Sequence, residues 1–278
     1  MPDEATAFVP GHITGFFSAH PDDDPTRAGS RGAGLTLTDG VEVTVRRAGE
    51  TTVTLDGESI EVDPVGTVLD ALGVSARVDA TSDVPLGAGF GVSGAMALGT
   101  ALAANHVFAR GLSYNELVTV AHGAEVRAGT GLGDVVAQAR GGVPIRLEPG
   151  APAYNSLDAI PQRARVEYVS FGQLSTADVL SGDTDRLTRA GEEALSRVVG
   201  EPTLPSFMYA SRRFAREAEL LTPTVFEVVT EVSDAGGEAS MAMLGETVFA
   251  LGTGLTDLGH DASACAIHPA GATLTSSG

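Results

Sequence analysis

The sequence contains no lysine: all 17 of its basic residues are arginine, and they stand against 36 acidic residues, for a formal net charge of −19. Negative charge on this scale argues against nucleic acids and anionic membranes as partners, because their phosphate groups would be repelled. The composition is typical of proteins from a high-salt cytoplasm, where screening over short distances removes most of the self-repulsion. We therefore expect a salt-adapted protein that acts on small molecules.

Cysteine is almost absent as well, since Cys265 is the only one and cannot form an internal disulfide. No apolar run approaches the roughly 18 residues of a membrane span. The first residues, Met1-Pro-Asp-Glu4, lack the basic region of a signal peptide. The six histidines are scattered singly, without the spacing of a metal site. These absences predict a cytoplasmic protein that does not span a membrane.

Glycine, by contrast, is abundant, and four glycines lie between positions 85 and 95. The residues of interest in this stretch are Pro85, Gly87, Gly89, Gly91, Ser93, Gly94 and Ala95. The stretch runs directly into Met96–Ala104, whose small and apolar residues predict a helix over 93–109. A glycine-rich turn that opens a helix leaves backbone N–H groups free, and the helix dipole favours an anion there. The turn therefore predicts a phosphate-binding site.

Several unrelated nucleotide-binding folds use such a turn. The Walker P-loop and the protein-kinase fold need a phosphate-binding lysine, which this chain lacks. The spacing Gly89-x-Gly91-x-x-Gly94 also matches the fingerprint of Rossmann domains, but that fingerprint requires a strand running into its first glycine. Pro85 predicts a loop at that point instead. Glu116, at the distance of a ribose carboxylate, belongs to a predicted capping box. The Rossmann interpretation is disfavoured and stays as an alternative.

The remainder of the chain predicts strands and helices in two domains. Strands are expected in the first third, with two-residue hairpin turns at Asp39-Gly40 and Asp56-Gly57. Prolines near 149–162 mark a boundary between domains of residues 1–155 and 156–278. Further helices are expected over 65–72, from Ser113, and over 134–139, 184–198, 204–221 and 223–235. Further strands are expected over 76–80, 165–170, 238–243 and 247–251, with a frayed end from 273.

Together these pieces resemble the GHMP kinases, a family of small-molecule kinases. The central motif of that family, a proline, three residues and then Gly-Leu-Gly-Ser-Ser-Ala, is matched by residues 85–95, with Phe90, Val92 and Gly94 as departures. The N-terminal motif is matched around Val9-Pro-Gly11. Within the family, four segments are most similar to the archaeal pantoate kinases: Pro10–Phe17, Ser30–Gly34, Thr130–Asp134 and Ser240–Gly245. A lysine-free acidic chain also fits a halophilic archaeon.

The resemblance implies an α+β fold of two domains. The N-terminal domain would be like domain 2 of ribosomal protein S5 and would bind ATP, and the C-terminal domain would be ferredoxin-like. The implied reaction is transfer of the γ-phosphoryl group of ATP, with Mg²⁺, to the 4-hydroxyl of pantoate, an archaeal step toward coenzyme A. Homoserine, shikimate or mevalonate as the acceptor, and a non-catalytic sensor of the same fold, are the alternatives. A homodimer is compatible with the sequence.

The resemblance also assigns candidate site residues. The backbone of residues 85–95 would cradle the ATP phosphates, and Ser93 and Glu125 would hold Mg²⁺. Asp134 would be the catalytic base, because a primary alcohol needs a carboxylate within hydrogen-bond reach to lose its proton. Pantoate would be bound by His12, Arg31, Gly131 and Gly133, with Arg31 as the clamp for its carboxylate.

Each of these side chains also has an ordinary structural interpretation. Ser93 and Asp134 are suited to helix N-caps, and Glu125 to a solvated helix face. Arg31 is equally typical of a surface arginine, and a lone histidine such as His12 is usually structural.

Overall fold

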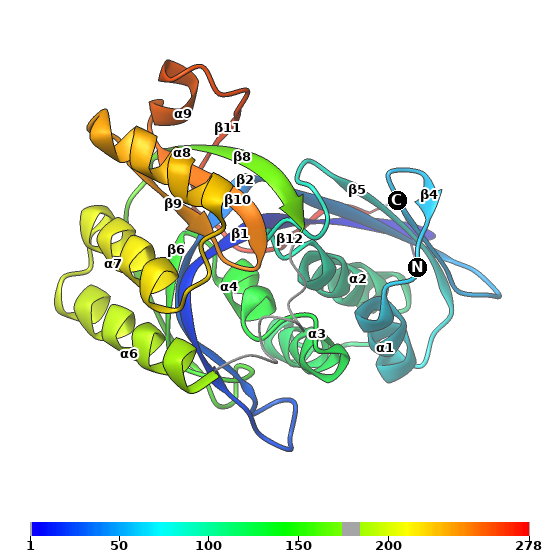
Figure 1. Ribbon diagram of the computed structural model, residues 1–278. Coiled ribbons are helices and arrows are strands. Elements are labelled where there is room, and N and C mark those ends of the chain that lie inside the picture. The colour runs from blue at the N-terminus through cyan, green and yellow to red at the C-terminus, as the bar shows by residue number, and fades with distance from the viewer. Residues whose placement is uncertain (1, 174–183, 278) are drawn as a thin grey trace.

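The computed structural model describes residues 2–173 and 184–277, and these residues form two β-sheets with helices packed against them (Figure 1). The larger sheet has the strand order β12-β1-β2-β5-β3-β4, and β6 extends it by pairing with both β2 and β7. Its strands are β1 (Glu4–His20), β2 (Gly29–Arg47), β3 (Thr52–Leu55), β4 (Glu58–Ser59), β5 (Ala76–Ser82), β6 (Val143–Glu148), β7 (Ser156–Ile160) and β12 (Thr273–Ser277). The helices of this part are α1 (Asp63–Leu72), α2 (Val92–Val107), α3 (Tyr114–Ala128) and α4 (Asp134–Arg140).

The smaller sheet is antiparallel, with the order β11-β8-β10-β9. In chain order its strands take the positions 4-1-3-2 of a ferredoxin-like domain, as the family resemblance implied. Its elements are β8 (Arg165–Gln173), α6 (Thr184–Gly200), α7 (Leu204–Glu217), α8 (Pro223–Asp234), β9 (Glu238–Ala242), β10 (Gly245–Leu251), α9 (Gly254–Asp257) and β11 (Ser263–Ala266). Helices α6 to α8 gather at one end of the molecule and α1 to α3 at the other (Figure 1). The α+β fold class is therefore confirmed.

Helix α2 is the centre of the N-terminal part, where it packs against both β1 and β2. Small residues allow this close approach: a Cβ atom at Gly99 would lie 2.6 Å from Val43 Cγ2. The helix begins directly after Gly91, so the packing fixes where the glycine turn lies. Helix α3 packs beside α2 and begins with the predicted capping box, in which Ser113 and Glu116 bond each other's backbone N–H groups. Glu116 therefore has a structural role.

The first predicted hairpin turn is wrong. Residues Asp39 and Gly40 lie inside the continuous strand β2, and neither has the positive φ that a two-residue hairpin turn needs. Gly40 instead lies opposite Pro10 on β1, so close that a Cβ atom would collide with the carbonyl oxygen of Val9. The second predicted turn is confirmed: Asp56 and Gly57 have φ values of 52° and 85° and join β3 to β4.

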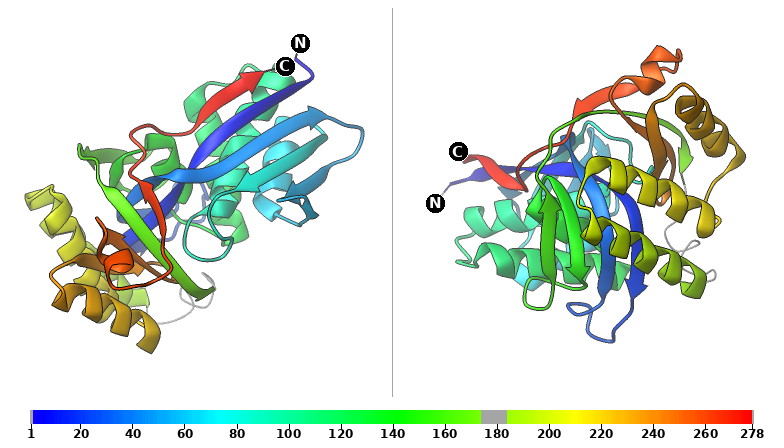
Figure 2. Two further views of the ribbon diagram at one scale, coloured as in Figure 1. Left: turned by 90° about the horizontal axis from the view of Figure 1, so that it is seen from above. Right: turned by 90° about the vertical axis from the view of Figure 1, so that its left-hand side faces the viewer.

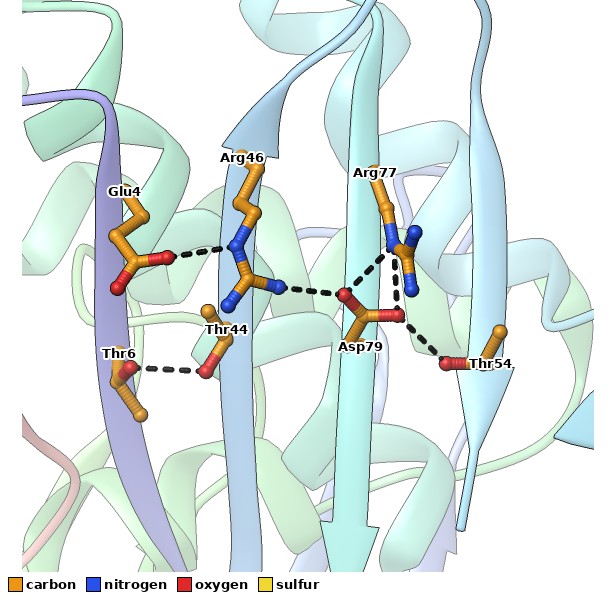
Figure 3. A network of polar contacts seen from close by, with 7 residues as sticks. All are labelled: Glu4, Thr6, Thr44, Arg46, Thr54, Arg77 and Asp79. Carbon is orange, nitrogen blue, oxygen red and sulfur yellow. Dashed lines mark hydrogen bonds and ion pairs between the residues drawn. The ribbon is translucent and has the colours of Figure 1, made fainter. Parts of the chain in front are cut away.

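The face of the larger sheet that the helices leave open carries a polar ladder (Figure 3). Arg46 on β2 binds Glu4 on β1 at 2.6 Å and Asp79 on β5 at 2.8 Å. Asp79 also binds Arg77 at 2.8 Å and accepts a hydrogen bond from Thr54 on β3. Such exposed ion pairs contribute only about 0 to 1 kcal/mol each. The strand side chains that alternate with them, such as Val43 and Val78, are fully buried on the helical side.

The C-terminal end was predicted to be frayed, and this is wrong for residues 273–277. They form β12, which pairs with β1, and Figure 2 shows the two strands side by side with the chain ends close together. Strand β7 likewise pairs with β6. Strands β7 and β12 therefore belong to the larger sheet although both follow residue 155, the predicted end of the first domain. The limits of the two domains stay a prediction. No helix in the described part of the chain is long and apolar enough to cross a membrane.

Candidate active site

The predicted phosphate turn leads into α2 with its backbone exposed. Gly91 is the N-cap of the helix, with φ of 64°, and no side chain caps the first N–H groups. Gly89 has φ of 87°, and a Cβ atom there would lie 2.8 Å from the carbonyl oxygen of Met243. Glycine is required at both positions, since a side chain would strain or block the turn. The free N–H groups and the dipole of a 16-residue helix make this turn a site for an anion.

A pocket of about 340 Å³ lies over this turn. It is bounded by the start of α2, the end of α3, the start of α4 and the turn between β9 and β10 (residues 243–244). Among its lining residues are seven of the predicted site residues: Gly87, Gly89, Gly91, Ser93, Gly94, Glu125 and Asp134. Pro85 and Ala95 are not in its lining, and Ala95 is buried in the core.

Ser93 and Glu125 meet at one wall of the pocket. The Ser93 hydroxyl donates a hydrogen bond of 2.6 Å to Glu125 Oε1, and Glu125 is only 2% exposed. Burial raises the pKa of Glu125 to about 7; the Ser93 hydrogen bond opposes this rise, and the nearby charge of Asp134 adds to it. Glu125 therefore does not lie on a solvated helix face, and Ser93 is not the N-cap of α2.

Two carboxylates converge above Gly131. A Cβ atom at Gly131 would lie 2.5 Å from Glu125 Oε2 and 3.2 Å from Asp134 Oδ2, so a larger residue would displace these carboxylates. Within residues 2–173 and 184–277, no group of three or more His, Cys, Asp or Glu side chains is arranged so that it could hold a metal ion by itself. A cation at this place would thus be held by the carboxylates and the Ser93 hydroxyl together with ligand oxygens, which are the donors that Mg²⁺ takes.

Asp134 is bound by a buried histidine. His12 Nδ1 lies 2.8 Å from Asp134 Oδ1, and His12 is fully buried. Burial lowers the pKa of His12, so the ring is neutral and its Nδ1–H donates to Asp134. Burial alone would raise the pKa of Asp134, but the hydrogen bond from His12 and the positive charge of Arg146 outweigh it and hold that pKa below its ordinary value. Asp134 is therefore an ionised carboxylate, and Gly133, not Asp134, is the N-cap of α4.

Arg146 on β6 is the site residue that the sequence interpretation missed. It is 1% exposed, and its Nε and Nη1 atoms have no hydrogen-bond partner among the described residues. Burial lowers its pKa to about 10, and Asp134 opposes this shift. The group stays charged at neutral pH. An arginine inside the apolar strand Val143–Leu147 was the available signal, because a buried arginine normally has an anionic partner.

Arg146 faces a small cavity that adjoins the phosphate pocket. The cavity is lined by Thr14, Phe17, Ser30, Leu132, Gly133, Asp134, Arg146 and Leu244. A Cβ atom at Gly133 would lie 2.5 Å from Ser30 Oγ and 2.7 Å from Arg146 Nε, so the loop passes directly over these two groups. A buried cation beside a hydroxyl group makes this cavity suitable for a carboxylate.

The structure places Arg31 away from both pockets. Its Nε donates to the carbonyl oxygen of Leu147 at 2.6 Å, and its Nη1 donates to Glu192 on α6 at 2.9 Å. Glu192 also accepts a hydrogen bond of 2.6 Å from Ser18. The charge of Arg31 is thus paired in a contact between β2 and α6, and Arg31 is absent from the lining of either pocket.

Similarity to known proteins identifies the family of this chain. The model of the GHMP kinases N terminal domain matches residues 63–142. The chain is similar to the pantoate kinase of Thermococcus kodakarensis, at 35% identity over 88% of this chain and 86% of the relative. It is similar to that of Methanospirillum hungatei, at 35% identity over 89% and 87%. A solved structure described as a phosphotransferase related to the CoA biosynthesis pathway superposes with a TM-score of 0.88, at 30% identity and 98% coverage of both chains. This chain belongs to the GHMP kinase family.

Proposed function

We propose that this protein is a pantoate kinase, which transfers the γ-phosphoryl group of ATP to the 4-hydroxyl of pantoate in coenzyme A biosynthesis. The observation that carries the proposal is the pair formed by Asp134 and Arg146. An ionised carboxylate and a buried, unpaired cation line one small cavity beside an anion-binding turn. A short acid with a hydroxyl at its other end carries the groups that this pair would bind, and pantoate is such an acid. Sequence similarity to pantoate kinases supports the same substrate.

The glycine turn would bind the phosphates of ATP. Its N–H groups and the start of α2 supply partial positive charge, which replaces the lysine that other phosphate loops use. A second, more open pocket shares Ala128 with the first and lies along β3, β4 and α1, and the adenosine would occupy it. Ser93 and Glu125 would hold Mg²⁺, whose charge neutralises the phosphate oxygens during transfer. Mg²⁺ suits this place because, among the described residues, only hydrogen bonds offset the cost of burying the charged form of Glu125.

Asp134 would act as the base. Its carboxylate accepts the proton of the substrate hydroxyl while the oxygen of that hydroxyl forms a bond to the γ-phosphorus. The bond between this phosphorus and the bridging oxygen of ATP breaks, and ADP leaves with that electron pair. The products are 4-phosphopantoate, ADP and a proton. His12 would act through Asp134, because the one hydrogen bond that its ring makes among the described residues orients and stabilises the ionised carboxylate.

Arg146 and Ser30 would bind the carboxylate of pantoate, in place of the predicted Arg31. Gly131 and Gly133 have no side chains, and this leaves space in the loop that they share. Gly131 leaves space for the two carboxylates, and Gly133 leaves space for Ser30 and Arg146. Groups for both ends of the substrate would thus line one cavity, and this would help to position the hydroxyl for in-line attack.

The test is a coupled assay of ADP release in molar KCl with Mg²⁺ and ATP. Pantoate, homoserine, shikimate and mevalonate are offered in turn, and phosphorus NMR identifies the phosphorylated product. We expect turnover with pantoate and a phosphomonoester on its primary hydroxyl. Turnover only with another alcohol would refute pantoate as the substrate, and binding of ligands without ADP release would identify a sensor.

We also propose a cytoplasmic enzyme from a halophilic archaeon, with domains of residues 1–155 and 156–278. The net charge of −19 and the absence of lysine support the salt adaptation. A homodimer is proposed as the state in solution, and size-exclusion chromatography with light scattering in molar KCl distinguishes it from a monomer.

A further inference from the structure

Leu244, between β9 and β10, has a backbone conformation that is unfavourable for leucine. Its φ of 65° lies in the left-handed region, where glycine and asparagine are the ordinary residues. The other non-glycine residues with positive φ in the described part of the chain are Asp56, Ala109 and Glu219. Those three are exposed, whereas Leu244 is half-buried and lines a pocket.

The surroundings of Leu244 hold its turn in place. The Met243 N–H donates to the carbonyl oxygen of Thr14 on β1 at 3.0 Å. On the other side, Thr247 donates to the carbonyl oxygen of Ala88 in the glycine turn at 2.9 Å. Gly245 packs so tightly against Ala88 that a Cβ atom there would collide with its carbonyl oxygen. The turn is therefore fixed between β1 and the glycine turn, and a strained residue within it persists for that reason.

Leu244 lies at the junction of the two pockets. Three residues line both the phosphate pocket and the small cavity: Thr14, Asp134 and Leu244. Asp134 accepts the hydroxyl proton in the proposed reaction. In the bound substrate, the carbon atoms next to that hydroxyl must therefore lie at this junction. Phe17 and Leu132 give the cavity further apolar surface. An apolar wall at this point suits a substrate whose carbon chain is branched beside its hydroxyl.

We propose that Leu244 is a specificity-determining residue, whose side chain packs against the two methyl groups on C3 of pantoate. This inference rests on the proposed function, because it assumes that pantoate binds with its hydroxyl at Asp134. C3 is bonded to the carbon that carries the reacting hydroxyl, and its methyl groups are the apolar part of the molecule. A leucine gives them a surface that glycine, the residue favoured by the backbone, would not provide.

The experiment compares pantoate with 2,4-dihydroxybutyrate, which is the same acid without the two methyl groups. For the unmodified enzyme we expect kcat/KM to favour pantoate by at least about tenfold, since each buried methyl group contributes to discrimination. Leu244→Gly relieves the backbone conformation and removes the apolar wall. We expect it to reduce this preference by about tenfold, mainly through a higher KM for pantoate.

Two further variants separate specificity from folding. Ala109→Gly relieves a positive φ of 50° at an exposed position after α2, so it should leave the preference unchanged. Leu244→Asn keeps a residue that tolerates the left-handed region but makes the wall polar, and it should lower the preference as Leu244→Gly does. An unchanged ratio in both Leu244 variants would overturn the inference while leaving the proposed function intact. An unmodified enzyme without activity on pantoate would overturn both.

Discussion

Replacing Glu125 by glutamine separates the energetic contribution of this buried carboxyl group from its shape. Burial raises its pKa from 4.5 to about 7, so the folded protein binds a proton there more tightly than the unfolded chain does. Ionisation of Glu125 therefore destabilises the folded state. The contribution of Glu125 to the free energy of unfolding is fully present below pH 4.5 and is lost as the pH rises through about 7. At about 1.4 kcal/mol per pKa unit, the loss above pH 7 amounts to about 3 kcal/mol.

Glutamine has nearly the same shape, keeps an oxygen that can accept the Ser93 hydrogen bond, and never ionises. Glu125→Gln should thus be more stable than the unmodified protein at pH 8.5, by about 3 kcal/mol or about 6 to 12 °C in Tm. At pH 4.5 the two proteins should unfold at nearly the same temperature. The same variant should lose Mg²⁺-dependent phosphoryl transfer, because it lacks the charge that holds the cation.

The assay is thermal unfolding with EDTA over pH 4.5 to 8.5 at constant molar KCl, followed by circular dichroism. Added Mg²⁺ should then raise the Tm of the unmodified protein at pH 8.5 and leave that of Glu125→Gln unchanged, since binding to the folded state alone stabilises it. A difference in Tm between the two proteins that does not change with pH would refute the reasoning, because it would show that ionisation of Glu125 is not the cause.

Four other substitutions test the remaining parts of the site. Asp134→Asn should lower kcat by at least about 100-fold with little change in the KM for ATP, and a loss under about tenfold would exclude a role as base. Arg146→Gln should raise the KM for pantoate at least about 100-fold, whereas Arg31→Gln should change it by less than about threefold. Steady-state kinetics with varied pantoate measures both values. A larger rise in KM for Arg31→Gln than for Arg146→Gln would show that Arg31 binds the carboxylate. Gly131→Ala places a Cβ atom 2.5 Å from Glu125 Oε2, so it should abolish activity at low millimolar Mg²⁺. The circular dichroism spectrum should stay unchanged. Full activity of this variant would contradict the convergence of the two carboxylates.

Local sequence signals predicted the elements of this fold well where they act within one element. The capping box at Ser113 and the Asp56-Gly57 turn both appear where the sequence placed them, because each satisfies its own hydrogen bonds or dihedral angles locally. The glycine turn at 85–95 is of the same kind: Gly87, Gly89 and Gly91 allow the positive φ angles that the turn takes, and the helix behind it follows from composition.

Signals that depend on a partner strand were misleading. Asp39-Gly40 has the composition of a hairpin turn, but Gly40 is glycine because the carbonyl oxygen of Val9 lies against it on β1. Asp39 accepts a hydrogen bond of 2.9 Å from Tyr168 on β8, which joins the two sheets. Strand β1 itself, which spans Glu4–His20, carries little alternation from Val9 onward, because residues 9–18 are all buried. None of these contacts is visible in a local pattern.

The choice between Arg31 and Arg146 shows the same limit within the site. Arg31 lies in a segment of small residues that resembles a binding loop, and its partner Glu192 is 161 positions away in the sequence. Arg146 lies in an apolar strand, which signals a buried arginine, but the sequence does not show that its Nε and Nη1 atoms have no hydrogen-bond partner among the described residues. Only the packing of β6 beside the loop at Gly133 brings that group to the cavity.

The buried polar atoms that lack partners explain why this site needs its ligands. Six buried side-chain nitrogen or oxygen atoms of the described residues have no hydrogen-bond partner, and four of them belong to His12, Gln138 and Arg146. Each such atom lowers the stability of the fold by about 1 to 3 kcal/mol, and by more where it carries a charge. A group of them in one place is therefore explained best by a function that needs them. Gln138 donates to the carbonyl oxygen of Gly91 at the phosphate turn, and Arg146 lines the same small cavity as Asp134. An anionic substrate that pairs with Arg146 would remove the largest of these penalties. Binding of that substrate would therefore stabilise the same residues that position it for phosphoryl transfer.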